Sequence, residues 1–87
     1  MSVTDGTDPA AALELARRFR AAASRVHGLA ETAGRALDGV AYEGPAASRD
    51  RSRLAEAAAV LRRSAAGLDE VAAAIQRLAV ALAGTLP

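Results

Sequence analysis

The sequence predicts an all-α protein: an antiparallel two-helix hairpin that pairs with a second hairpin into a four-helix bundle dimer. Alanine and leucine, both strong helix formers, supply 25 and 10 of the 87 residues. Apolar residues recur at alternating steps of three and four positions, which is typical of helices that pack along one stripe. Gly44-Pro45 interrupts this spacing near the middle of the chain and therefore predicts a turn between two helices.

The first helix is predicted over residues 9–38. Asp8 suits the N-cap, Pro9 suits the first turn, and Gly39 follows as a stop. Residues 1–7 are polar and are expected to form a disordered tail. The stripe expected to face the second helix is Leu15, Phe19, Ala22, Val26, Leu29, Ala33, Ala36 and Val40. A second apolar stripe runs along its flank: Ala16, Ala23, Ala30 and Leu37.

The second helix is predicted over residues 45–83, after a turn at 39–44. Gly84 ends it, residues 85–87 form a short tail, and the hairpin domain spans residues 8–84. The connection is short, so the helices are expected to lie antiparallel. The stripe of the second helix is uncharged except at Arg51: Ala47, Arg51, Leu54, Ala58, Leu61, Ala65, Leu68, Ala72, Ile75, Ala79, Leu82 and Leu86.

Both helices are apolar over a wider surface than an isolated hairpin buries. The second helix adds Ala57, Val71 and Leu78 beside its stripe, with Ser64 between them. Burial in so small a scaffold barely offsets the chain entropy lost on folding. We therefore expect a homodimer, or a heterodimer with another helical-hairpin protein. The residues expected at the hairpin or dimer interface are Leu15, Phe19, Val26, Leu29, Leu37, Leu54, Leu61, Leu68, Val71, Ile75, Leu78 and Leu82.

The composition excludes several classes of function. There is no cysteine, so neither a disulfide framework nor a thiolate metal site is possible. His27 is the only histidine and falls on the outer side of the first helix, where we expect a solvated side chain and no catalytic or metal site. No phosphate-binding or nucleophile motif is present. We expect no enzyme activity and no cofactor.

The charge pattern argues against binding to nucleic acid. The net charge is +1 and all eleven basic residues are arginine, balanced by ten acids. This balance favours a solvated helix surface, with pairs such as Glu14–Arg18 and Glu31–Arg35, over an anionic membrane surface as partner. The longest uncharged stretch at the C-terminal end, Leu78 to Pro87, is too short to span a membrane. Asp5 and Asp8 without a basic residue predict no cleaved secretory signal.

The turn carries the only tyrosine, Tyr42, two residues before Gly44 and followed by Pro45, Ala46 and Ala47. By itself this is a Gly-Pro turn with an aromatic ring at the end of the bundle. A chain of this length, with Ala-rich heptads around Tyr42-x-Gly44, resembles the small WXG-motif (ESAT-like) proteins of bacterial type VII secretion. In that family a Trp-x-Gly motif occupies the turn of a helical hairpin. Here tyrosine replaces the tryptophan, and no Tyr-x-x-x-Asp/Glu export signal follows the second helix.

The resemblance implies a non-enzymatic type VII secretion substrate or adaptor. Such a protein dimerises as a hairpin and is exported folded, or escorts a partner, from the cytoplasm without a cleaved signal. Tyr42, Gly44 and Pro45 would form the recognition turn, and the partners would include a secretion ATPase or a larger secreted effector. The alternative is an intracellular coiled-coil scaffold that shares the same hairpin.

Overall fold

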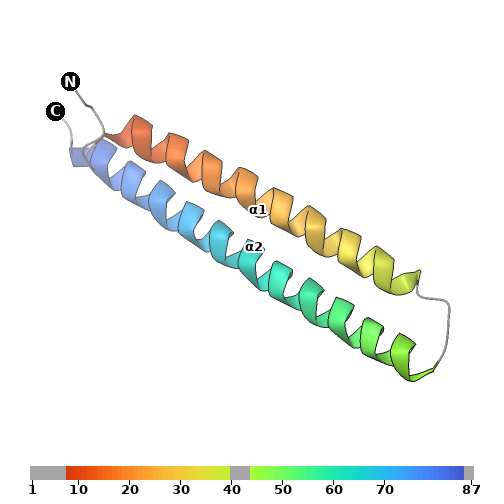
Figure 1. Cartoon of the computed structure of the whole chain (residues 1–87). Helices are drawn as coiled ribbons and strands as arrows, with labels where there is room; N and C mark the ends of the chain where they lie inside the picture. Colours follow the sequence, from red (N-terminus) through yellow and green to blue (C-terminus); the bar gives the residue numbers. More distant parts are fainter. Residues whose placement is uncertain (1–7, 40–43, 86–87) are drawn as a thin grey trace.

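The computed structural model describes residues 8–39 and 44–85, and within them the predicted all-α antiparallel hairpin is confirmed (Figure 1). Helix α1 spans Pro9–Asp38 and helix α2 spans Pro45–Thr85. The two helices lie side by side over their whole shared length, and α1 begins next to the end of α2. The predicted tails at residues 1–7 and 86–87 lie outside the described residues.

Helix α1 begins and ends with local hydrogen bonds that its sequence provides. The Asp8 side chain accepts a hydrogen bond from the backbone N–H of Ala10 at 3.0 Å, as an N-cap residue does, and Pro9 occupies the first turn. At the other end, the Gly39 N–H donates to the carbonyl oxygens of Arg35 and Ala36. Gly39 has a φ of −83°, so this stop does not use the left-handed conformation that favours glycine.

Helix α2 extends two residues beyond its predicted end. Gly84 was expected to stop the helix, but the helix continues through Thr85. The Thr85 hydroxyl donates to the carbonyl oxygen of Leu82 at 2.8 Å, which satisfies one of the acceptors that a helix C-terminus leaves open. At the start of α2, Gly44 has a φ of +114°, a conformation that side chains with a Cβ rarely adopt.

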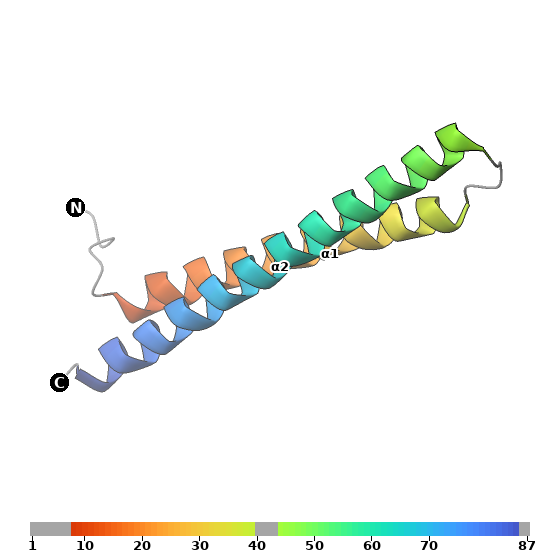
Figure 2. The ribbon, with the colours of Figure 1, turned by 90° about the horizontal axis from the view of Figure 1, so that it is seen from below.

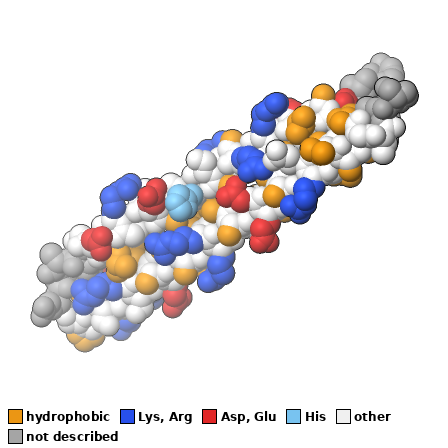
Figure 3. Space-filling model, turned by 180° about the vertical axis from the view of Figure 1, so that it is seen from behind, with side chains coloured by type: hydrophobic (Ala, Val, Ile, Leu, Met, Phe, Trp, Pro, Cys, Tyr) orange, Lys and Arg blue, Asp and Glu red, His pale blue; other side chains and the backbone are white. Residues whose placement is uncertain are grey.

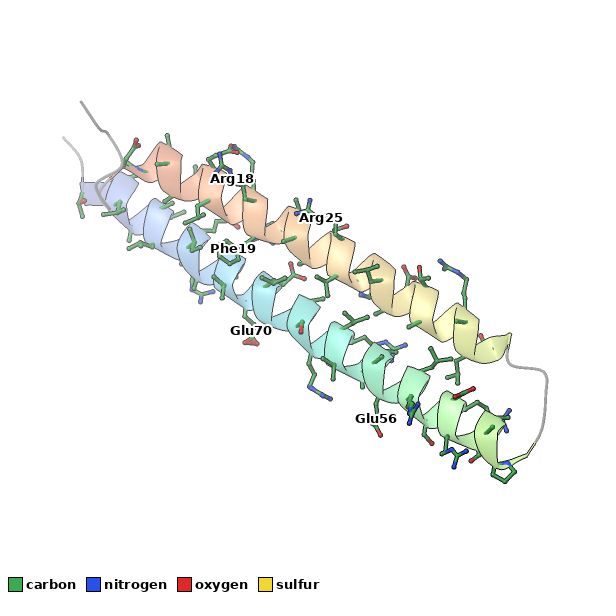
Figure 4. All side chains as sticks on the ribbon, in the orientation of Figure 1. Arg18, Phe19, Arg25, Glu56 and Glu70 are labelled. Atoms are coloured by element: carbon green, nitrogen blue, oxygen red, sulfur yellow. The ribbon has the colours of Figure 1, made fainter. Side chains whose placement is uncertain are left out.

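Alanine alone makes up the fully buried core of the described residues. The buried positions follow a seven-residue repeat over most of both helices: Ala16, Ala23, Ala30, Ala47, Ala58, Ala65, Ala72 and Ala79. Because alanine is small, a core of this kind allows two helices to approach closely. Larger side chains, among them Phe19, flank the alanines and are only half-buried (Figure 4). The helices cross at a shallow angle (Figure 2).

The contacting stripe of α2 is the predicted one, whereas that of α1 is predicted only in part: Phe19, Val26 and Ala33 are half-buried as expected, but Leu15 and Leu29 are exposed. In α1, Ala16, Ala23 and Ala30 are buried, while Leu15 and Leu29, which were expected to face α2, are exposed. The alanine stripe that the sequence placed on the flank is thus the true contact. The reason is packing: α2 presents an alanine at every seventh position, and only small residues on α1 allow the same close approach.

The hairpin is long and thin for its mass. It measures 67 × 21 × 15 Å, and its radius of gyration is 19.2 Å, where a compact chain of this length has about 12 Å. It exposes 6090 Å² of surface, whereas a compact monomer of its mass exposes about 4,800 Å². No described helix is long and apolar enough to cross a membrane. The surface that the hairpin exposes beyond that of a compact monomer therefore needs a functional explanation.

Candidate protein interface

The row of buried alanines has two flanks of different chemistry. The polar face consists of five residues that stand four positions after a buried alanine, and the apolar face of seven residues that stand one position before a buried alanine. In an antiparallel pair of helices, equivalent flanks of the two helices lie on the same side. The polar face comprises Arg20, His27, Arg62, Asp69 and Gln76, and the apolar face comprises Leu15, Ala22, Leu29, Ala57, Ser64, Val71 and Leu78.

Contacts across the helices define the polar face. The Arg20 guanidinium donates a hydrogen bond to the Gln76 side-chain oxygen, joining α1 to α2. Near the turn end, the Arg62 guanidinium lies against Gly34, 3.8 Å from where a Cβ of residue 34 would stand. The facing pairs Arg20–Gln76 and Gly34–Arg62 belong to the same antiparallel register of the two helices.

A shallow groove of about 470 Å³ lies on the polar face, and Figure 3 shows this side of the molecule with its histidine among arginine and acidic side chains. His27 lines the groove together with Arg20, Arg62 and Asp69, and it is exposed. The groove is open to solvent and does not enclose a reactive group. Among the residues that the structure describes, no three His, Cys, Asp or Glu side chains come close enough to hold a metal ion.

The apolar face carries most of the large hydrophobic side chains that the hairpin leaves exposed. Leu15 and Leu29 are 44% and 58% exposed on α1, and Val71 and Leu78 are 42% and 52% exposed on α2. These four residues were predicted to lie at the hairpin or dimer interface. Contiguous exposed apolar surface is typical of places where another protein docks.

The other nominated interface residues lie closer to the helix contact. They are half-buried, and they line the space beside the alanines: Phe19, Val26, Leu37, Leu54, Leu61, Leu68, Ile75 and Leu82. The structure thus divides the set into a group that contacts the opposite helix and a group on the apolar face. The predicted dimer stays a prediction, because a single chain shows no partner.

The turn is described only in part. Tyr42 lies outside the described residues, so the predicted Tyr42-x-Gly44 motif cannot be placed as a unit. Gly44 and Pro45 are both exposed at the start of α2. A second helix beginning with Pro45 at its first position, after a glycine with positive φ, explains why these two residue types stand here.

One of the two predicted surface ion pairs forms. Glu14 lies 3.6 Å from Arg18, and it also lies 3.1 Å from Arg17. Glu31 does not pair with Arg35 in the structure, because the Arg35 guanidinium instead donates to the Thr32 hydroxyl at 3.2 Å. Both arrangements are exposed and stabilise the helix by only a few tenths of a kcal/mol.

Comparison with known proteins does not extend this description: no family model, curated protein or solved structure matches the chain.

Proposed function

We propose that this chain is a non-enzymatic adaptor or substrate of type VII secretion that works by pairing with a second helical hairpin. One observation carries the pairing: only alanines are buried between the two helices, and Leu15, Leu29, Val71 and Leu78 remain exposed on one side. A stable hairpin does not need these larger side chains there, and water penalises their exposure. A partner hairpin that covers the apolar face gives them a role.

The polar face supports the same proposal. It holds Arg20, Asp69 and Gln76 in an open groove whose side chains hydrogen-bond to each other or face solvent. Such a surface keeps the assembled bundle soluble on its outside. A shallow groove without a positioned nucleophile, base or metal cluster offers little for catalysis.

The secretion part of the proposal rests on the sequence of the turn. Tyr42-x-Gly44 stands where the WXG-motif proteins carry Trp-x-Gly, between two long helices. By this analogy Tyr42, Gly44 and Pro45 form half of a composite recognition site that a secretion ATPase or a larger effector completes. In this proposal the chain contributes the turn to the pair. It would leave the cytoplasm folded and without a cleaved signal.

Replacement of Tyr42 tests the role in export. In the producing bacterium, Tyr42→Ala is expected to reduce the amount of this chain, or of its partner, in the culture supernatant on an immunoblot. The purified variant is expected to keep the circular dichroism of the wild type, because the change lies outside both helices. Tyr42→Trp is the matched control, since it retains a large aromatic ring and is expected to retain export. Unchanged export of the alanine variant contradicts the proposal.

The exposed apolar face also suits a second candidate, an intracellular coiled-coil scaffold. In that case the apolar face binds a resident protein and the turn has no role in recognition. The same immunoblot distinguishes the two, because a scaffold stays in the cell pellet whichever residue occupies position 42.

A further inference from the structure

Helix α2 carries a second heptad stripe that faces away from the contact with α1. It follows steps of three and four, as the first stripe does, and lies about 110° around the helix from it at 100° per residue. Every member is exposed and none is charged: Ala57, Val60, Ser64, Gly67, Val71, Ala74, Leu78 and Ala81. We call this set the outer stripe. The hairpin itself leaves about half of the surface of its larger side chains, Val60, Val71 and Leu78, exposed.

We propose that the outer stripe binds the outer stripe of a second copy of this chain, antiparallel, with Gly67 on the two-fold axis. This inference rests on the proposed pairing function and names its partner. An isologous interface requires the same surface to be complementary to itself. The outer stripe meets this requirement in the size of its side chains and in the charges beside it.

The sizes of the side chains are complementary about Gly67. Residues whose distances from the axis along the chain differ by no more than one position lie in the same layer and face each other, as equivalent flanks do in α1 and α2. Val60 then faces Ala74 of the second copy, Ser64 faces Val71, and Ala57 faces Leu78. Each layer combines a larger with a smaller side chain, which fills space without overpacking.

Gly67 itself is unexplained by the isolated hairpin. It lies inside α2, is exposed, and has no atom of another residue near the position of a Cβ. Glycine in a helix interior costs about 1 kcal/mol relative to alanine. At the two-fold axis, two copies of Gly67 face each other, and the lack of side chains lets the two α2 helices approach closely.

The charges beside the outer stripe provide independent support. Two positions before each buried alanine of α2 stand Glu56, Arg63, Glu70 and Arg77, alternating in sign and all exposed. Figure 4 shows Glu56 and Glu70 pointing away from α1. None of the four forms an ion pair or a side-chain hydrogen bond with another described residue. With Gly67 on the axis, Arg63 faces Glu70 of the second copy and Glu56 faces Arg77, so all four charges meet an opposite charge.

The same charges disfavour the neighbouring registers. If the second copy slides by one heptad in one direction, Glu56 faces Glu70 and Arg63 faces its own copy. A slide in the other direction places Arg63 opposite Arg77 and Glu70 opposite its own copy. Like charges that face each other are destabilising, so the alternation selects one register.

The two-fold axis also places the rest of the apolar face inside the assembly. A two-fold perpendicular to two antiparallel helices keeps both α1 helices on the same side of the α2 pair. Leu15 and Leu29 of each copy then face the interior between the four helices, because they share a side with Val71 and Leu78. The polar face with Arg20 and Gln76 stays outside. The result is a four-helix bundle in which the α2 helices form the centre.

A charge-swap series tests the interface by light scattering after size exclusion, over a range of concentrations. Wild type is expected at twice the chain mass of 8.8 kDa. Arg63→Glu alone and Glu70→Arg alone are each expected to raise the dissociation constant by roughly tenfold, since two contacts per dimer become repulsive. The double variant Arg63→Glu/Glu70→Arg restores the wild-type value, and an equimolar mixture of the two single variants forms a heterodimer. Residues three and four positions from Arg63 and Glu70 in α2 are uncharged, so these changes leave the hairpin itself intact.

Arg62→Glu and Asp69→Arg are the matched controls. They make the same changes of charge one residue earlier in the chain, on the polar face, and are expected to leave the dimer mass unchanged. A monomeric wild type, or a dimer that is insensitive to the single reversals or is not restored by the double variant, overturns the inference. That result does not affect the proposed role in export, which the Tyr42 variants test separately.

Discussion

The two flanks of the alanine row differ in a way that the hairpin does not require. On the polar face, Arg20 and Gln76 join the helices by a hydrogen bond and the surrounding side chains are charged. On the apolar face, the equivalent positions hold Leu15, Leu29 and Leu78, which remain exposed. Both flanks border the same contact, and either chemistry is compatible with it. In the proposed assembly, the polar face meets water and the apolar face meets protein.

The largest expected effect comes from the contact between the flanks. Ala72 is fully buried, and Ala72→Asp places an unpaired charge where two helices touch. We expect the hairpin to lose more than about 3 kcal/mol and to unfold, because the alanine core has little stability in reserve. Circular dichroism during thermal unfolding measures this. Ala21→Asp makes the same change at an exposed position of α1 and is expected to preserve the helical signal; equal melting curves for the two variants would contradict the assignment of the core.

An intermediate effect is expected when a charge is placed on the apolar face. Val71→Asp places a charge on the apolar face and is expected to weaken self-association by roughly 100-fold, since the charge must be desolvated in the dimer. Val80→Asp changes the same residue type on the same helix, where the valine is 66% exposed and borders Gln76 and Arg77. That variant is expected to dimerise as wild type does. Sedimentation equilibrium measures the dissociation constant of each variant. Equal dissociation constants would contradict a special role of the apolar face in self-association.

The smallest effect concerns glycine in the two helices. Gly67→Ala and Gly28→Ala both add a Cβ where no atom lies within 4 Å, so each is expected to raise the helical stability of the single chain by up to about 1 kcal/mol. Only Gly67→Ala is expected to weaken the dimer, because it separates the helices at the two-fold axis. Titration by dilution, with helicity and mass followed together, measures both quantities. A dimer strengthened by Gly67→Ala would place the axis elsewhere.

The sequence predicted many residues of the candidate interface, but it did not predict on which side of the hairpin they lie. Leu15, Leu29, Val71 and Leu78 were nominated as interface residues because they are apolar and lie at helical spacing. Whether they face the other helix or the outside was not decided by that spacing, since any apolar residue adjacent to a seam position fits it equally well. The polar face was missed: the contact of Arg20 with Gln76 joins residues far apart in the chain, and only the register of the two helices reveals it.

The sequence by itself determined that this chain forms two long helices, where they start, and which stripe of α2 is buried. Asp8-Pro9 and Gly44-Pro45 act locally and start the two helices. On the side of α2 that contacts α1, one stripe has alanine at every seventh position, and no other stripe on that side matches it. Only the tertiary structure decided which stripe of α1 is buried. Its leucine stripe and its alanine stripe have the same period, so periodicity cannot rank them. The choice depends on the other helix: the alanines of α2 permit a close approach, and this approach is possible only when Ala16, Ala23 and Ala30 face them.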